Sequence, residues 1–233
     1  MVRLEFQGYA KGKVEHVTAE IENLVIAGWT GRDVGALNHH IEELKAIGIE
    51  PPSKVPIYYR VSAALLTQAD AIQVLGDDSS GEVEPVLVGA ADRLWVTVGA
   101  DHTDRRVESY GIAVSKQMCA KPIGRTAWRF EEVEPHWDRL MLRSFIQEGG
   151  QEGGKRVLYQ EGPLANIRMP RELIAGWQDG NQRLPMGTAM FCGTMGAIGA
   201  IRPSSHFEME LDDPVLGRKI THAYDVKTLP VVA

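Results

Sequence analysis

The chain has 233 residues and 44% of them are hydrophobic, which allows one large domain or two small ones with a substantial core. Its formal net charge of -6 argues against nucleic acid and anionic membranes as partners. The apolar runs are too short to span a bilayer, and the N-terminus alternates like a strand rather than a signal peptide. The two cysteines, Cys119 and Cys192, follow no paired metal-ligand spacing. We therefore expect a cytoplasmic protein without a disulfide framework.

The first part of the chain alternates apolar and polar residues. Residues 3–30 predict two or three strands, the last ending in the apolar run at 23–28. Asp33 resembles an N-cap, and Gly48 resembles the end of the helix that would follow. The apolar residues between them have helical spacing: Leu37, Ile41, Leu44 and Ile47. Three prolines then lead into an extended segment at 57–60.

The remainder reads mainly as strands. A turn at 76–81 precedes strand-like runs that continue to about residue 124. A helix is expected over 134–147, on the shared face of Trp137, Leu140, Met141 and Phe145, followed by a glycine-rich loop at 149–154. A short helix is expected from Pro170 to Trp177, and strands again from Leu184. This pattern predicts a β-dominated α+β fold.

Two carboxylates lie close together at the start of one expected strand. Glu82 and Glu84 are two residues apart, so on a strand they project from the same face. Asp101 follows the next expected strand, 94–99. Three converging carboxylates repel one another unless a cation neutralises them, and hard oxygen ligands favour magnesium, calcium or manganese. The alternative is a solvated edge strand, which is the usual role of an isolated Glu-x-Glu.

A histidine and a glutamate share one face of the first expected helix. His40 and Glu43 are three residues apart, so they can meet, and a carboxylate beside an imidazole suits it to activating water. The alternative is an ordinary surface pair. We reject a zinc site formed by His39 and His40, because neighbouring side chains on a helix diverge by about 100°.

Three further features indicate a functional role only if a cation is bound nearby. Lys116, which we place after an apolar strand, can bind a substrate carboxylate or stabilise developing negative charge, or it is a surface lysine. Gly193 and Thr194 lie in a glycine-rich run that can hold a small anion or simply bend the chain. His102 either supports the metal site or is an ordinary polar residue. Nothing marks Cys192 as an activated nucleophile.

In order, these motifs resemble the fumarylacetoacetate hydrolase superfamily over residues 36 to 213, most of the chain. No single motif is specific to the superfamily, but the order of the motifs along the chain is. The matching runs are His40-Ile41-Glu42-Glu43-Leu44, Glu82-Val83-Glu84, Asp101 through Arg105, Lys116 with Pro122-Ile123-Gly124, and Leu184–Gly187 with Gly193–Gly196.

The resemblance implies a single domain, 1–233, with N-terminal strands of about 1–35 on a core of about 36–233. It implies stacked mixed β-sheets forming a roll with a few short helices, and a homodimer. Glu82, Glu84 and Asp101 would hold Mg²⁺, with Ca²⁺ or Mn²⁺ as alternatives.

The resemblance also assigns roles to the remaining residues. Lys116 would be catalytic, His40 and Glu43 would activate water on a mobile lid, and Arg105, Gly193 and Thr194 would bind substrate. Such a cation polarises the carbonyl of a 2-oxo acid and stabilises the enolate.

Members of the superfamily act on 2-oxo or 1,3-dicarbonyl acids. The preserved His40 and Glu43 favour a hydrolase that cleaves a carbon–carbon bond in a small acylpyruvate-like acid. A decarboxylase or an enol–keto isomerase or hydratase at the same metal is the alternative, and a catalytically inactive metal-binding protein is a second one. The sequence departs from the superfamily at Ala36-Leu37 and Arg60-Val61, and 137–162 matches none of its usual members.

Overall fold

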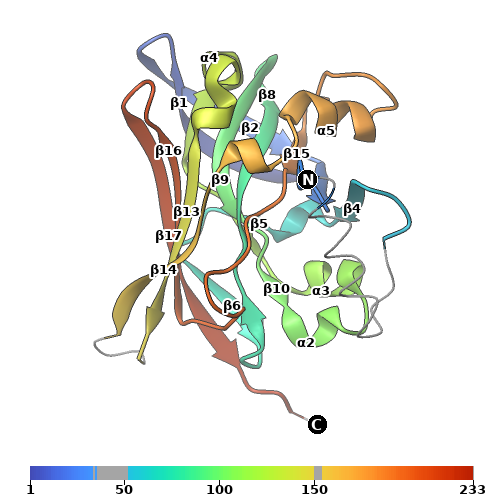
Figure 1. Ribbon diagram of the computed structural model, residues 1–233, viewed down its shortest axis with the longest axis vertical. Helices are drawn as coiled ribbons and strands as arrows, with labels where there is room; N and C mark the ends of the chain where they lie inside the picture. The colour runs from blue at the N-terminus through green and yellow to red at the C-terminus, as the bar shows by residue number, and fades with distance from the viewer. Residues whose placement is uncertain (34, 36–51, 150–153, 233) are drawn as a thin grey trace.

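The computed structural model describes residues 1–33, 35, 52–149 and 154–232. Strands dominate it, and most of them belong to two large mixed sheets (Figure 1). The larger sheet has eight strands, in the order β2 (Lys13–Ile21), β1 (Val2–Ala10), β12 (Thr126–Arg129), β9 (Arg93–Ala100), β8 (Val83–Ala90), β15 (Thr188–Phe191), β3 (Asn23–Gly28) and β4 (Ile57–Val61).

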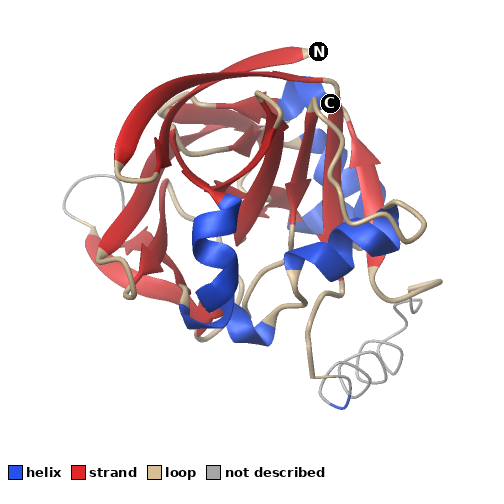
Figure 2. Cartoon of the chain, turned by 90° about the horizontal axis from the view of Figure 1, so that it is seen from above, coloured by secondary structure: helices blue, strands red, loops and turns tan. Residues whose placement is uncertain are grey.

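The second sheet has five strands, in the order β14 (Lys155–Pro163), β13 (Met141–Glu148), β16 (His206–Asp213), β17 (Arg218–Leu229) and β6 (Ala71–Leu75). Two short pairs complete the strands: β10 (Thr103–Asp104) with β7 (Ser79–Ser80), and β11 (Lys121–Pro122) with β5 (Leu66–Thr67). Viewed from above, the strands curl around the interior of the molecule (Figure 2).

The described helices are all short. The α-helices are α2 (Arg105–Glu108), α3 (Ile112–Met118), α4 (Phe130–Val133) and α5 (Pro170–Trp177). The 3₁₀ helices are η1 (Ala63–Leu65), η2 (Glu134–Arg139) and η3 (Leu164–Asn166). The expected β-dominated α+β fold with a few short helices is confirmed. None of the helices in the described residues combines the length and apolar character that crossing a membrane requires.

Strand β8 is buried along its whole length, because both of its faces pack against apolar side chains. Val83 and Leu87 belong to the core that this sheet shares with the five-stranded sheet. Val86 and Val88 face a second core on the opposite side, which includes Phe6 of β1. A strand fixed on both faces has little freedom at its ends, so it holds the residues there in defined positions.

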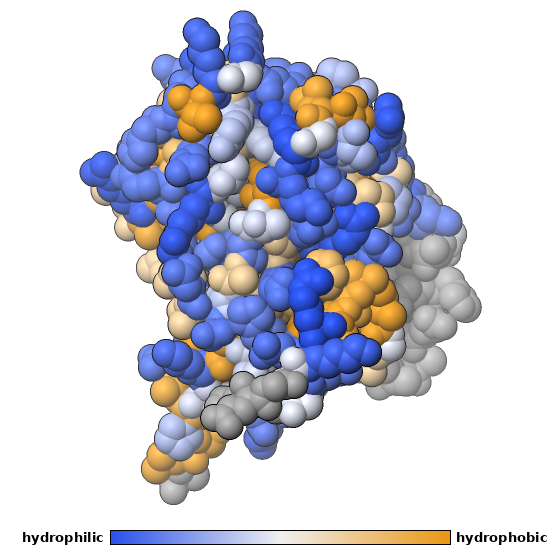
Figure 3. All heavy atoms as spheres, turned by 90° about the vertical axis from the view of Figure 1, so that its left-hand side faces the viewer, coloured by the Kyte–Doolittle hydropathy of each residue, from blue (hydrophilic) through white to orange (hydrophobic). Residues whose placement is uncertain are grey.

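The five-stranded sheet has one apolar and one solvated face. Along β16, Phe207, Met209 and Leu211 are buried, and the residues between them are less so. The outer face carries ion pairs such as Arg143 with Glu210, 2.9 Å apart. Figure 3 views the molecule from this side, and hydrophilic side chains cover most of the surface. The alternation is that of a sheet with one face towards the core and one towards water.

The expected helix over 134–147 is wrong. Only 134–139 is helical, as η2, and Met141–Glu148 is strand β13. Leu142, Ser144 and Ile146 are buried and their neighbours are not, which is a period of two rather than 3.6. The apolar Met141 and Phe145, on the outer face of β13, produced the false helical pattern.

The placement of Lys116 after a strand is also wrong, because Lys116 lies within helix α3. The expected N-terminal strands are confirmed as β1, β2 and β3, and the helix from Pro170 to Trp177 is confirmed as α5. The expected helix between Asp33 and Gly48, with His40 and Glu43, lies outside the described residues. The division of the single domain into N-terminal strands and a catalytic core stays a prediction.

Candidate metal centre and its cavity

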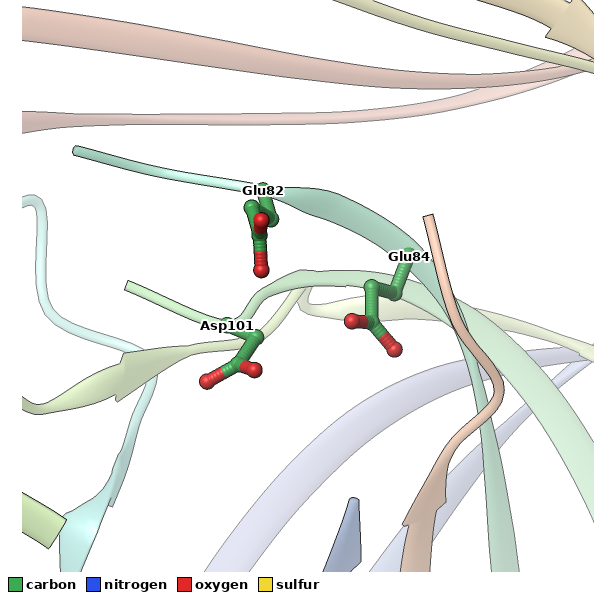
Figure 4. Close-up of side chains that lie close together, drawn as sticks. All are labelled: Glu82, Glu84 and Asp101. Carbon is green, nitrogen blue, oxygen red and sulfur yellow. The ribbon is translucent and has the colours of Figure 1, made fainter. Parts of the chain in front are cut away.

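Glu82, Glu84 and Asp101 come together at one end of the antiparallel pair β8 and β9. Glu84 pairs with Gly99 in the ladder, and the amide of Asp101 donates a 2.9 Å hydrogen bond to the carbonyl of Glu82. The register therefore places Asp101 beside the two glutamates. One oxygen from each of the three carboxylates lies within 4.8 Å of the others. Figure 4 shows the three side chains gathered around a common space.

Asp101 is fully buried and held between two lysines. Its Oδ2 accepts a hydrogen bond from Nζ of Lys116, and its Oδ1 lies 3.0 Å from Nζ of Lys121. Burial by itself would raise the pKa of Asp101, but the two ammonium groups outweigh it and hold the pKa below its usual value. The same carboxylate raises the pKa of Lys116, against the effect of burial. Asp101 is therefore ionised, as a carboxylate that binds a cation must be.

Glu84 is the least compensated of the three carboxylates. Burial raises its pKa well above the usual value, and the negative charge of Asp101 raises it further. Its Oε2 accepts a 2.6 Å hydrogen bond from the backbone amide of Gly193. Gly193 has a φ of 103°, and a Cβ there would overlap Oγ1 of Thr30. Only glycine can therefore present this amide to Glu84.

Glu82 is more open and is held by Arg105. Nη2 of Arg105 lies 3.2 Å from Oε1 of Glu82, and its Nη1 lies 3.0 Å from Oε2 of Glu108. Nε of Arg105 donates a 2.7 Å hydrogen bond to Oγ of Ser80. Arg105 starts helix α2, which is capped by the side chain of Asp104. Glu108 and Ser80 thus fix the guanidinium beside Glu82.

The three carboxylates fit a hard divalent cation. Two opposite ligands of Mg²⁺ lie about 4.2 Å apart, and those of Ca²⁺ roughly 4.6–5.2 Å. Three oxygens within 4.8 Å of one another are close enough to share one such cation after small side-chain movements. A carboxylate accepts about four hydrogen bonds or ligand contacts, so Asp101 retains capacity beyond its two lysines. The raised pKa of Glu84 also marks a negative charge that a cation would stabilise.

His102 supports this site from behind. Its Nδ1 lies 2.9 Å from the hydroxyl of Tyr224, and its Nε2 lies 2.9 Å from Oγ of Ser79. Burial lowers the pKa of His102 to about 3, so the ring is neutral. Its carbonyl accepts a hydrogen bond from Nζ of Lys121. His102 therefore anchors the segment that carries Asp101.

Thr194 and Gln160 form a hydrogen-bonded network beside Glu84. Oγ1 of Thr194 donates to the carbonyl of Val83 at 2.7 Å and accepts from Nε2 of Gln160 at 2.8 Å. Oε1 of Gln160 in turn accepts from the amide of Val83 at 3.0 Å. The hydroxyl proton of Thr194 and the amide proton of Gly193 are thus both bonded to protein groups. In this arrangement Gly193 and Thr194 hold Glu84 and the start of β8 in place. The role of Gly193 and Thr194 in substrate binding stays a prediction.

The cluster opens into a cavity of about 700 Å³. The charged residues that line it are Glu82, Glu84, Arg105, Glu108 and Lys116. The uncharged ones are polar residues such as Thr194, aromatic and aliphatic residues, and glycines, mainly from the end of β3, from β4, α3 and β14, and from the segment after β15. No histidine lines it in the described part of the chain. The volume is typical of a small-molecule site.

Two residues of the site were missed from the sequence. Lys121 belongs to no motif of the sequence, although it is fully buried on Asp101. Its short apolar neighbours, Ala120 and Pro122, were a weak signal of burial. Gln160 belongs to the stretch 137–162, which matches no usual superfamily member, and it gave no signal. Cys192 is a free, buried thiol whose pKa is raised by burial, in agreement with its reading as an inert side chain.

A family model described as "Protein of unknown function (DUF2848)" matches residues 27–224. No match was found among the curated proteins.

Solved structures match along almost the whole chain. A candidate fumarylpyruvate hydrolase from Burkholderia cenocepacia is 18% identical, with a TM-score of 0.60, covering 99% of this chain and 97% of the other. A candidate fumarylacetoacetate isomerase/hydrolase from Oleispira antarctica is 15% identical, with a TM-score of 0.63, covering 98% of this chain and 100% of the other. The apo form of a 2-keto-3-deoxy-D-arabinonate dehydratase is 16% identical, with a TM-score of 0.60, covering 90% of this chain and 74% of the other. These likenesses show the expected fold.

Proposed function

Because the chain belongs to the family described as "Protein of unknown function (DUF2848)", whose name gives no activity, we propose its function from the site: a divalent-metal-dependent enzyme that acts on a small 2-oxo acid. Its fold is that of the fumarylacetoacetate hydrolase family. The observation that carries the proposal is the convergence of Glu82, Glu84 and Asp101 within 4.8 Å at a 700 Å³ cavity. Carboxylate oxygens suit a hard cation, and we take Mg²⁺ as that cation, with Ca²⁺ or Mn²⁺ as alternatives. The bound cation would polarise the 2-oxo carbonyl and stabilise negative charge on it.

The reaction we propose is hydrolysis of an acylpyruvate. Water adds its oxygen to the acyl carbon, and the bond between that carbon and the neighbouring methylene breaks. The acyl group leaves as a carboxylic acid, and the methylene carbon takes up a proton and becomes the methyl group of pyruvate. Two of the structural neighbours bear hydrolase names, which supports this class of reaction.

Lys116 is the described residue best placed to assist this reaction. It is buried at the cavity wall, 4.0 Å from Glu82, and its raised pKa keeps it protonated. An ammonium group fixed in a dry site stabilises negative charge that develops on nearby substrate oxygens. Arg105 lines the same wall and would orient the substrate carboxylate.

Activation of the water is assigned to His40 and Glu43, which lie outside the described residues. This assignment distinguishes hydrolysis from decarboxylation and isomerisation, because those reactions need no attacking water.

A dehydratase or decarboxylase that uses the same cation is the second candidate. A dehydratase is among the structural neighbours, and the described cavity wall contains no histidine to act as a base. A third candidate, a metal-binding protein without catalysis, would bind the cation and turn over nothing.

The predicted homodimer and the cytoplasmic location remain proposals.

Turnover of acetylpyruvate with Mg²⁺ tests the proposal. Hydrolysis forms acetate and pyruvate in equal amounts, and we expect Glu84→Gln to remove the Mg²⁺ dependence. We expect His40→Ala to lower kcat by a hundredfold or more, since general-base catalysis contributes typically 10²–10⁴-fold. Unchanged turnover by His40→Ala would refute hydrolysis through this base. Carbon dioxide release from oxaloacetate without acetylpyruvate cleavage would favour the decarboxylase instead.

A further inference from the structure

The charges at the cavity limit how many negative charges a substrate can have. Three carboxylates line the described wall, those of Glu82, Glu84 and Glu108, against two cations, Arg105 and Lys116. The buried pair of Asp101 with Lys121 adds no net charge behind them. A divalent cation would turn this single negative excess into a single positive one. One substrate carboxylate neutralises it, and a second would be in excess.

Both lining cations already have protein partners. Arg105 is paired with Glu82 at 3.2 Å and Glu108 at 3.0 Å, and Lys116 is bonded to Asp101. In the described part of the wall, a second substrate carboxylate would therefore meet only cations that protein carboxylates already balance. Burying a charge without a partner is costly, so the wall selects against dicarboxylates.

About half of the uncharged residues in the wall are aromatic or aliphatic, and the others are glycines and four polar residues. The large apolar and aromatic side chains are those of Trp29, Tyr59, Ile112, Tyr159, Met195 and Ile201. The cavity of about 700 Å³ is in the range that holds drug-sized ligands, more than an acid of three or four carbons fills. Such a wall gains affinity from apolar surface on a ligand.

The backbone at Trp29 provides a second observation. Trp29 has a φ of 57°, a left-handed conformation that bulky side chains rarely adopt. It follows Gly28 at the end of β3, among consecutive residues, Ala27 to Gly31, that all line the cavity. Strain of this kind persists where the surrounding structure holds it and is concentrated at ligand sites. The chain thus keeps a large aromatic side chain at the cavity in spite of its backbone cost.

We propose that the site takes a 2-oxo acid with a single carboxylate and an apolar tail, and that the tail lies against Trp29, Tyr59 and Tyr159. The proposal rests on the proposed function and narrows its substrate class. Fumaryl-type acids and oxaloacetate, with their second carboxylate, are then poor substrates.

Binding of oxamates to the Mg²⁺-loaded protein, measured by calorimetry, tests this without turnover. Oxamate mimics the 2-oxo-carboxylate, N-pentyl oxamate adds an apolar tail, and N-(4-carboxybutyl) oxamate adds a tail of similar length that ends in a carboxylate. A fully buried methylene tightens binding about fourfold. We therefore expect N-pentyl oxamate to bind at least tenfold tighter than oxamate, and the carboxylated analogue to gain nothing. If the carboxylated analogue bound as tightly as N-pentyl oxamate, or more tightly, the proposal would be overturned.

Variants locate the tail. We define the N-pentyl preference as the dissociation constant of oxamate divided by that of N-pentyl oxamate. We expect Trp29→Ala to reduce this ratio by about fivefold or more. Ile201→Ser should also reduce it, and since Ile201 is 55% exposed this substitution spares the core. Tyr110→Ala is the control, because Tyr110 is 83% exposed and does not line the cavity, so its ratio should be unchanged. A ratio unchanged in both wall variants contradicts the assignment. If oxamate and oxalate show no Mg²⁺-dependent binding, the metal site itself fails, and both proposals fall together.

Discussion

Replacing Lys121 by methionine tests whether the buried charges form one coupled unit. Lys121 is fully buried, with its Nζ 3.0 Å from Oδ1 of Asp101 and hydrogen-bonded to the carbonyl of His102. Methionine has a similar length and is apolar, so Lys121→Met leaves little empty space. It removes one of the two cations that balance Asp101.

The size of the effect follows from burial. Removing one partner of a buried ion pair costs about 3–5 kcal/mol, and the remaining Lys116 places Lys121→Met near the lower end. For a chain of this size, about 3 kcal/mol lowers Tm by roughly 6–12 °C. Lys219→Met is the control, because Lys219 pairs with Glu210 at the surface, where its side chain is 45% exposed. Such pairs contribute about 0.2–1 kcal/mol.

Calorimetry and urea unfolding of the metal-free variants measure these differences. Loss of a positive charge beside a metal ligand also reduces the repulsion of a divalent cation. Mg²⁺ should therefore raise the Tm of Lys121→Met by more than it raises that of the unchanged protein. A metal-free Tm for Lys121→Met as high as that for Lys219→Met would refute the coupling of Lys121 to Asp101.

Two other predictions concern the glycine run and the acid dependence of stability. Gly193→Ala should weaken Mg²⁺ binding about 10- to 100-fold in a calorimetric titration, because the Cβ displaces the amide that holds Glu84. Gly196→Ala, where a Cβ meets no atom within 4 Å, should bind Mg²⁺ normally, and equal affinities would contradict this role of Gly193. Burial opposes the ionisation of Asp213, but the amide of Leu216 and the side chain of His136 prevail and lower its pKa. Its ionised form therefore stabilises the fold above the unfolded pKa of about 3.9, and this contribution is lost as the pH falls through the lower folded pKa. In urea unfolding, Asp213→Asn should cost roughly 1.5–3 kcal/mol at pH 6, and the cost should decrease as the pH falls below about 3.9, whereas a cost independent of pH would exclude this explanation.

Local patterns were sufficient where the structure depends on neighbours in sequence. Glu82 and Glu84 could be placed together because a strand fixes the direction of alternate side chains. Asp101 could be added because an antiparallel neighbour returns to the same end of the sheet.

The same patterns failed where packing between elements distant in the sequence decides which side chains are buried and which come together. The outward-facing Met141 and Phe145 imitated a helical face, since only the packing of the five-stranded sheet against the core that it shares with β8 shows which face of β13 is buried. Lys121 gave no sign that it would face Asp101, because burial of a lysine depends on a partner 20 positions away in the sequence. The uncharged cavity wall is assembled from segments as distant as Trp29 and Ile201, and no spacing rule brings those together.

The most direct test of the metal site is the anomalous difference density of crystals soaked with Mn²⁺. We expect one strong peak at bonding distance from a carboxylate oxygen of each of Glu82, Glu84 and Asp101, and its loss in Glu84→Gln. A map without a peak between these three carboxylates, at a Mn²⁺ concentration that shows peaks elsewhere, would contradict the assignment of this cluster as the metal centre.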